Sequence, residues 1–129
     1  MIEHVNIKPL HFVGTNERGA TYDFTLRQSD DFILMKRHAG TLSGNAYHTG
    51  ISNKINPKTF ILLEGSIELM YRSIDESVHH VEKIDVPSII EVYPNVTHAM
   101  KALTDIIVLE AHGFKDTEND RHFLNVVPE

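Results

Sequence analysis

The fold is decided by two stretches, Gly44-Asn45-Ala46-Tyr47-His48 and Tyr93-Pro94-Asn95-Val96-Thr97-His98-Ala99. Each stretch puts one histidine at the end of a predicted β-strand, beside turn-forming residues. If both strands belong to one small barrel, His48 and His98 point into the same cavity. Imidazole is the side chain best suited to metal ligation or proton transfer near neutral pH, so the two histidines mark the expected place of a site.

Predicted β-strands follow one another along the rest of the chain. A short apolar run, Thr59-Phe60-Ile61-Leu62-Leu63, is β-prone and is expected to be buried on both faces. It ends at Glu64-Gly65-Ser66, a corner where glycine takes positive φ. Strands at intervals of about 8 to 12 residues with Gly, Pro and Asn turns are typical of a β-sandwich or barrel. The expected strands are residues 20–27, 32–37, 42–49, 59–63, 67–74, 78–86, 89–93, 99–103 and 106–111.

The two end regions of the chain have less regular patterns, and each gives its own structural prediction. Residues 2–13 predict an extended arm or edge strand, and Asn16-Glu17-Arg18-Gly19 predicts a turn. Apolar and polar residues alternate over 20–27, which predicts a half-buried strand. The charged run 115–121 is interpreted as solvated surface. The apolar residues at the end of the chain are expected to dock on the barrel or on a second subunit.

In these stretches the chain resembles the cupin superfamily. The Leu63-Glu64-Gly65 corner is similar to the end of the first cupin motif, and residues 93–98 are similar to the second. The Asn16–Gly19 turn and the strand after it are similar to the start of cupins that act on nucleotide-linked sugars, particularly the dTDP-4-keto-6-deoxyglucose ketoisomerases. The resemblance covers roughly residues 14–112.

The resemblance implies an all-β fold, a double-stranded β-helix or jelly-roll cupin barrel. Residues 1–129 would form one cupin domain, with an N-terminal arm over 1–13, a barrel core over about 14–112 and a C-terminal tail over 113–129. A homodimer is expected, from the resemblance and from the apolar residues at both ends.

The departures from the cupin motifs concern the site. Where the first motif has His-x-His, the chain has Ala46-Tyr47-His48, and the motif glutamate falls on Lys58. Residues 49–57 are inserted before the corner at Gly65. The four-ligand metal set of the family is thereby reduced to His48 and His98, and the acid/base histidine pair of the ketoisomerases is reduced to one.

Each candidate residue has two interpretations. His98 is a catalytic group or metal ligand of the cavity, or else a histidine that is hydrogen-bonded within the barrel wall. His48 is likewise a catalytic group or metal ligand, or else a histidine at the end of a strand. Arg18 binds a phosphate of a nucleotide ligand through its guanidinium fork, or is a surface arginine. Tyr71 and Tyr93 bind substrate in the cavity, or pack in the core. If the barrel mouth binds anions, the alternative cations are Arg27, Lys36, Arg37 and Arg72.

A divalent metal (Zn, Ni, Fe or Mn) is a further possibility for the barrel. Protein sites for such ions usually have at least three ligands, and His48 and His98 supply two. The adjacent His79 and His80 are not expected to bind one metal, because neighbouring residues on a strand point to opposite faces. Candidates for the third ligand are Glu64, Glu91, Asn45 and the residues of the insertion.

Composition narrows the classes of partner. The net charge of −6 argues against nucleic acid and anionic membranes, which require a basic face. No apolar run approaches the roughly 18 residues that span a bilayer, and no signal peptide is visible. The chain has no cysteine, which fits a reducing cytoplasm. The expected partner is therefore a small-molecule ligand of a cytoplasmic protein.

Three functions from different classes stay open. The first is a small-molecule-binding cupin whose most concrete form is a sugar or nucleotide-sugar isomerase or epimerase, with His48 as base and His98 or a tyrosine as its partner. The second is a metal-dependent cupin enzyme of the dioxygenase or isomerase type. The third is a non-catalytic cupin that binds or senses a sugar or carboxylate.

Overall fold

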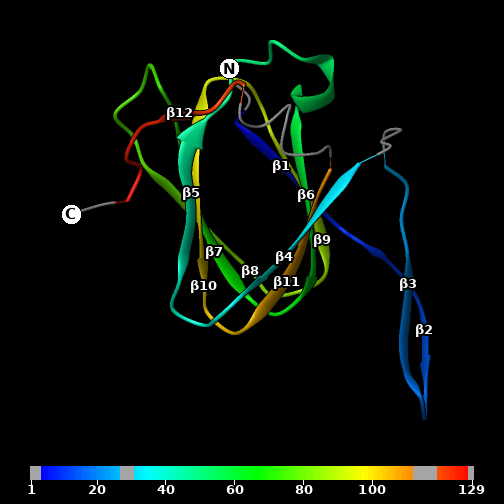
Figure 1. Cartoon of the computed structure of the whole chain (residues 1–129). Coiled ribbons are helices and arrows are strands. Elements are labelled where there is room, and N and C mark those ends of the chain that lie inside the picture. The colour runs from blue at the N-terminus through cyan, green and yellow to red at the C-terminus, as the bar shows by residue number, and fades with distance from the viewer. Residues whose placement is uncertain (1–3, 27–30, 112–118, 128–129) are drawn as a thin grey trace.

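The computed structural model describes residues 4–26, 31–111 and 119–127. Two five-stranded antiparallel sheets face each other and form a barrel (Figure 1). The strand order is β1-β9-β6-β11-β4 in the first sheet and β12-β5-β10-β7-β8 in the second. The bounds are β1 Val5–Pro9, β2 His11–Asn16, β3 Gly19–Asp23, β4 Phe32–Arg37, β5 Leu42–Tyr47, η1 Asn53–Ile55, β6 Lys58–Glu64, β7 Ile67–Ser73, β8 His80–Ile84, β9 Ser88–Val92, β10 Val96–Ala102, β11 Ile106–Ala111 and β12 His122–Phe123.

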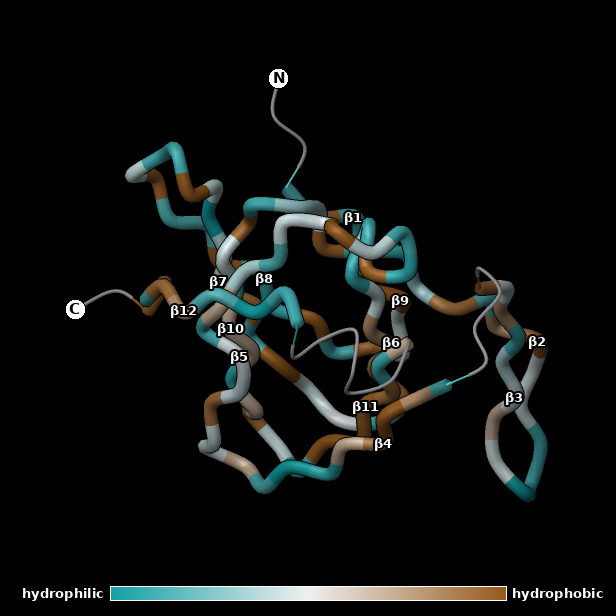
Figure 2. The backbone as a smooth tube through the Cα atoms, turned by 45° about the horizontal axis from the view of Figure 1, so that its top comes forward, coloured by the Kyte–Doolittle hydropathy of each residue, from teal (hydrophilic) through white to brown (hydrophobic). Residues whose placement is uncertain are grey.

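Apolar side chains fill most of the space between the two sheets. Seen toward one end of the barrel, the strands surround this interior on all sides (Figure 2). Strand β6 is buried from Lys58 to Leu62, and the burial of residues 59–62 is as expected from the apolar run. Its outer face is covered as well, because Ile61 packs against Leu10 and Ile89. Each fully buried aliphatic side chain of this kind contributes about 1.5–3 kcal/mol to folding.

The corner between β6 and β7 has the predicted form. Gly65 has φ of 96°, in the left-handed region that favours glycine. A Cβ at this position would collide with the carbonyl oxygen of Asp105 and with the side chains of Thr104 and Ile106. The corner therefore requires glycine both for its backbone conformation and for its close contact with the neighbouring turn.

A two-stranded hairpin, β2–β3, projects from the barrel (Figure 1). The predicted turn at residues 16–19 lies at its tip, where the Arg18 N–H donates to Oδ1 of Asn16 at 2.8 Å. The strand predicted for 20–27 is confirmed over 20–23, within β3, but its predicted half-burial is wrong over 20–25, because these residues are exposed. Residue 27 lies outside the described residues. The alternating residues belong to the hairpin instead, where the rings of Phe12 and Tyr22 pack edge-on with their centroids 5.5 Å apart.

Strand β10 begins earlier than its sequence suggested. The turn at Tyr93–Asn95, where Asn95 has φ of 63°, leads directly into a strand from Val96. His98 is therefore the third residue of a strand rather than a residue at a strand end. Neighbouring strands pair with β10 on both sides, so His98 lies opposite Ala46 of β5 and Tyr71 of β7.

Both ends of the described chain contribute to the sheets. Strand β1, in the predicted arm, pairs with β9, and β12, in the predicted tail, pairs with β5. Val126 is fully buried against Met70 and Ala99, so the apolar end of the chain docks on its own barrel. Within the described residues, no helix is long and apolar enough to cross a membrane.

Candidate functional site

A cavity of about 320 Å³ lies between the two sheets. Both predicted histidines, His48 and His98, line it, and most of the remaining wall is apolar. The polar part of the wall, besides the histidines, consists of Arg37, Ser43, Glu110 and Arg121, and the apolar part includes Met35, Phe60, Met100, Ile106 and Val108.

A β-bulge in β5 directs side chains into this cavity. The register pairs His98 with Ala46 and Ala99 with Gly44, which leaves Asn45 as an extra residue. Asn45 has φ of 66°. Its side-chain amide donates a hydrogen bond to Oδ1 of Asn125 and accepts one from the N–H of Val126. Bulges of this kind re-aim side chains, and here Gly44, Ala46 and His48 all line the cavity.

The two imidazole rings face each other across the cavity. Their centroids are 6.0 Å apart, with an angle of 42° between the planes. Nδ1 of His48 lies 2.5 Å from the carbonyl oxygen of Asp120, and Nδ1 of His98 lies 3.1 Å from that of Val96. Since a carbonyl only accepts, each Nδ1 carries the proton and each Nε2 carries a lone pair. Both rings therefore offer a basic nitrogen to a ligand.

Burial keeps both rings neutral. It lowers the pKa of His98 to about 4, against the opposing hydrogen bond to Val96 and with help from the charges of His48 and Lys58. Burial also lowers the pKa of His48, while the hydrogen bond to the Asp120 carbonyl opposes the shift and the charge of Lys58 adds to it. Near neutral pH the cavity thus contains two uncharged imidazoles.

The depressed pKa of His98 predicts a loss of stability in acid. The neutral ring stabilises the fold fully above pH 6.5, and this contribution disappears as the pH falls toward 4, because the unfolded chain takes up the proton first. Between pH 7.5 and 4.5 we expect His98 to account for a loss of about 2–3 kcal/mol in the free energy of unfolding. Urea unfolding of the wild type and of His98→Gln across this range measures it. Parallel pH curves for the two proteins would contradict the prediction.

Asp120 fixes the loop next to His48. Its carboxylate, 1% exposed, accepts hydrogen bonds from the N–H and hydroxyl of Thr49 and from the N–H groups of Gly50 and Ile51, at 2.8–3.1 Å. Burial raises the pKa of Asp120, but these hydrogen bonds outweigh burial and lower it to about 2. Since the same residue accepts from His48 through its carbonyl, Asp120 joins the ring to the loop. The interpretation of Asp120 as solvated surface is therefore wrong.

A buried ion pair lies in the wall of the cavity. Lys58 Nζ and Glu110 Oε1 are 2.7 Å apart, and the side chains are 1% and 10% exposed. The ammonium group also lies 6.0 Å from the centroid of the Phe60 ring, and that ring and His98 are in an edge-to-face arrangement with centroids 5.8 Å apart. The sequence had shown only that Lys58 stands where the cupin motif has glutamate. Glu110 within the apolar strand β11 was the unnoticed signal for its partner.

The three predicted substrate-binding residues do not line the cavity. Arg18 is exposed at the tip of the projecting hairpin. Tyr71 is buried beside His98, and its hydroxyl donates to Glu82 at 3.1 Å. Burial and this carboxylate raise the pKa of Tyr71 to about 12. Tyr93 follows β9, and its N–H donates to the His4 carbonyl at 3.0 Å. Of the alternative cations, Arg37 does line the cavity, and Arg27 lies outside the described residues.

Three of the candidates for a third metal ligand, Glu64, Glu91 and Asn45, are not among the residues that line the cavity with His48 and His98. Of the proposed third ligands, Glu91 binds Lys8 and Asn6, Asn45 holds the C-terminal segment, and Glu64 is exposed at the end of β6. Glu110 is the one carboxylate among the described lining residues, and it is paired with Lys58. The ammonium group of Lys58 also opposes a second cation beside Glu110.

Comparison with known proteins gives structural matches only. No family model matches the chain, and no curated protein matches it. Among solved structures, it is similar to QdtA, a sugar 3,4-ketoisomerase from Thermoanaerobacterium thermosaccharolyticum in complex with TDP. That match has a TM-score of 0.71 and 15% identity, and covers 94% of this chain and 88% of QdtA.

Two further solved structures match over most of this chain. ChmJ, a 3'-monoepimerase from Streptomyces bikiniensis in complex with dTDP-quinovose, has a TM-score of 0.75 and 15% identity, with 96% of this chain and 71% of ChmJ covered. CapF, a capsular polysaccharide assembling protein from Staphylococcus aureus, has a TM-score of 0.62 and 17% identity, with 92% of this chain and 35% of CapF covered. At these identities the likeness shows the fold.

Proposed function

Because this chain has the cupin jelly-roll fold, we propose that it is an isomerase or epimerase of a sugar derivative, with His48 and His98 at the reacting carbon atoms. The reaction moves a proton on a carbon atom next to a carbonyl group. It needs a base for that proton and donors for the oxygen on which negative charge develops. The substrate class that fits best is a nucleotide-linked keto sugar.

The observation that carries the proposal is the pair of neutral imidazoles with free Nε2 atoms. We assign the base to His48, because its Nδ1–H donates to the Asp120 carbonyl and this bond stabilises the imidazolium that forms. The centroid of the His98 ring lies 6.0 Å from that of His48, close enough for both rings to contact one reacting group. In an isomerisation His48 returns the proton to the former carbonyl carbon, while the original hydroxyl group gives up its proton and the former carbonyl oxygen takes one up.

The size and charge of the cavity support a sugar derivative. A volume of about 320 Å³ is at the lower end of ligand pockets and suits one sugar ring. Arg37 is exposed and lines the same cavity, as does Arg121, whose guanidinium lies 5.2 Å from the Phe123 ring. Guanidinium groups bind phosphate through paired hydrogen bonds, so these two are the proposed partners of a nucleotide diphosphate.

The ligands of the matched structures belong to the same class of compound. QdtA forms a complex with TDP, a histidine-to-asparagine mutant of QdtA forms one with TDP-4-keto-6-deoxyglucose, and ChmJ forms one with dTDP-quinovose. These proteins share the fold with this chain at 15% identity. Their ligands are therefore the first compounds to test, whereas the roles proposed for His48 and His98 rest on the geometry of this chain.

Deuterium exchange tests the proposed chemistry. We expect the wild type to exchange the proton next to the carbonyl of TDP-4-keto-6-deoxyglucose in D₂O, followed by mass spectrometry. Loss of an acid/base group lowers such rates about 10²–10⁴-fold, so His48→Asn should lose at least about 100-fold. His11→Asn is the matched control, since His11 is exposed on the hairpin beside Asp23 and should exchange at the wild-type rate.

Binding data separate the enzyme from the alternatives. A ligand at about 100 times its Kd should add roughly 2.7 kcal/mol to the free energy of unfolding. If the keto sugar stabilises the protein without exchange, the chain is a non-catalytic binder and the isomerase proposal fails. Equal exchange by the wild type and His48→Asn would remove His48 from its proposed role.

A further inference from the structure

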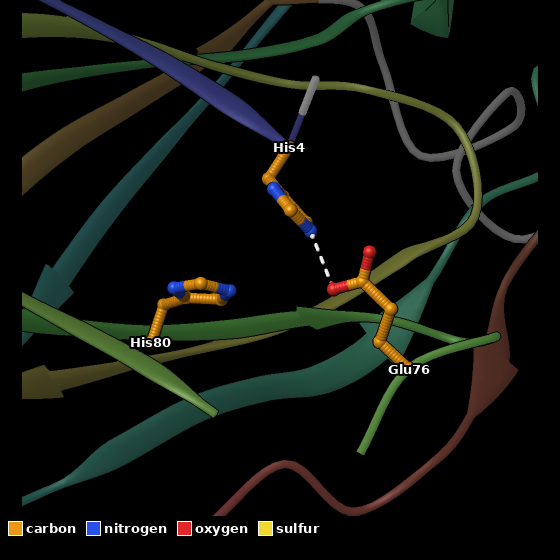
Figure 3. A group of neighbouring side chains, drawn as sticks. All are labelled: His4, Glu76 and His80. Atoms are coloured by element: carbon orange, nitrogen blue, oxygen red, sulfur yellow. Dashed lines mark hydrogen bonds and ion pairs between the residues drawn. The ribbon is translucent and has the colours of Figure 1, made fainter. Parts of the chain in front are cut away.

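Three potential metal ligands meet away from the lining residues of the barrel cavity (Figure 3). His4 lies just before β1, the edge strand of the first sheet. Glu76 lies in the turn between β7 and β8, and His80 begins β8, the edge strand of the second sheet. One nitrogen or oxygen atom from each of the three lies within 4.8 Å of those of the other two.

The orientation of the two histidines is fixed by their neighbours. The His80 ring stacks on Tyr71, with centroids 5.1 Å apart and an angle of 15° between the planes. The His4 ring packs against the same two residues, with its centroid 4.8 Å from that of His80 and 5.8 Å from that of Tyr71. Rings held in this way lose little freedom when they bind a ligand.

His80 carries the observation that points to a missing partner. Its Nε2 is the only buried side-chain nitrogen or oxygen of the described residues that has no hydrogen-bond partner. Figure 3 shows this ring edge directed toward Glu76 and His4. Buried polar atoms in native proteins are almost always paired, so an unpaired one at the centre of a ligand cluster indicates something that binds there.

An ion pair alone does not explain this arrangement. His4 Nε2 lies 3.3 Å from Glu76 Oε2, which satisfies those two groups and leaves His80 Nε2 unpaired. A cation between the three groups would give each of them a partner. In a tetrahedral zinc site with bonds of about 2.0–2.1 Å, ligand atoms are about 3.3 Å apart, which is the separation already present in the His4–Glu76 pair.

We propose that His4, Glu76 and His80 bind one divalent cation, with Zn²⁺ as the best fit. Two imidazoles and one carboxylate form a mixed nitrogen and oxygen set that suits zinc, and the fourth position is left for water. Glu76 also lines an open hollow of about 620 Å³, so the ion can enter from solvent. This proposal does not depend on the proposed function.

The cation would connect the edges of the two sheets. His4 is joined to β1 and His80 belongs to β8, and the two strands belong to different sheets. Because the three ligands come together only in the folded chain, binding favours the folded state. The expected role is therefore structural, as a cross-link between the N-terminal strand and the β7–β8 hairpin.

Zinc titration of the full chain tests the site. We expect chelator-treated protein to bind Zn²⁺ by calorimetry with one equivalent at this site, to unfold at a higher temperature with zinc, and to lose both effects with EDTA. Changes around a metal ligand already cost about 10–100-fold in affinity, so His80→Gln should lose at least about 100-fold. Glu76→Gln removes a ligand charge without changing side-chain size and should show the same loss of affinity. It therefore tests the site even if His80→Gln folds poorly.

Two control variants distinguish zinc binding at this site from binding elsewhere on the protein. His11→Gln tests for binding by a surface histidine, and the double variant His48→Gln/His98→Gln tests for binding in the barrel. Both should retain the equivalent that His80→Gln loses. The proposal is overturned if the wild type binds no stoichiometric zinc, if His80→Gln binds it normally, or if only the barrel double variant loses it.

Discussion

Lys58→Met is expected to lower the free energy of unfolding by about 3–5 kcal/mol. The side chain of Lys58 is 1% exposed, and its ammonium group lies 2.7 Å from Glu110, whose side chain is 10% exposed. Methionine fills nearly the same volume, so the loss reports the charge rather than a cavity. The carboxylate of Glu110 would be left as a buried charge without its ammonium partner. Urea unfolding at pH 7 measures the change.

A double-mutant cycle identifies the cause. If the stability lost in Lys58→Met comes from the unpaired carboxylate of Glu110, the double variant Lys58→Met/Glu110→Leu should recover most of it. Its free energy of unfolding should lie within about 1 kcal/mol of the wild-type value. Replacing a buried ion pair by apolar residues is often neutral or stabilising. If the losses of the two single variants simply add, the pair is not coupled and the prediction fails.

Asp120→Ala is expected to cost about 3–4 kcal/mol in stability and to reduce deuterium exchange as well. Its carboxylate accepts from Thr49, Gly50 and Ile51, and each donor left without a partner costs about 1–3 kcal/mol, less where water reaches it. The carbonyl that holds His48 belongs to the same residue, so a loosened segment also frees the ring. Asp120 is in this sense a positioning residue.

Asp120→Asn separates charge from shape. The amide keeps one acceptor oxygen, so we expect about half of the loss found for alanine. Acid should act on the wild type in the same direction. The Asp120 pKa of about 2 lies below the unfolded value of 3.8, so its stabilisation is complete above pH 3.8 and is lost as the pH falls toward 2. Chemical denaturation of the three proteins from pH 7 to pH 2 tests this, and an alanine variant as stable as the wild type would contradict it.

The fold could be predicted from sequence because its signals are local. Alternation and apolar runs located β4, β6, β7 and β11 to within a residue or two, and the cupin resemblance correctly implied the jelly-roll. The same reasoning brought His48 and His98 into one cavity. The projecting hairpin was missed, since an exposed ribbon and a half-buried strand have the same period of two.

The rest of the site depends on contacts between distant residues. Lys58 and Asp120 are charged, and a charged side chain in a sequence is normally assigned to the surface. Their burial follows only from partners elsewhere, Glu110 for the lysine and the N–H groups of residues 49–51 for the aspartate. The homodimer, the cytoplasmic location and a metal in the barrel stay predictions.

The order of the strands has a consequence for biosynthesis. Every sheet of the barrel is completed by late residues, since β4 pairs with β11, β1 with β9, and β5 with β12. Such non-local pairing makes a domain fold in milliseconds to seconds rather than microseconds. The carbonyl that orients His48 is near the end of the chain, so a nascent polypeptide on the ribosome has no finished pocket until translation has passed residue 120.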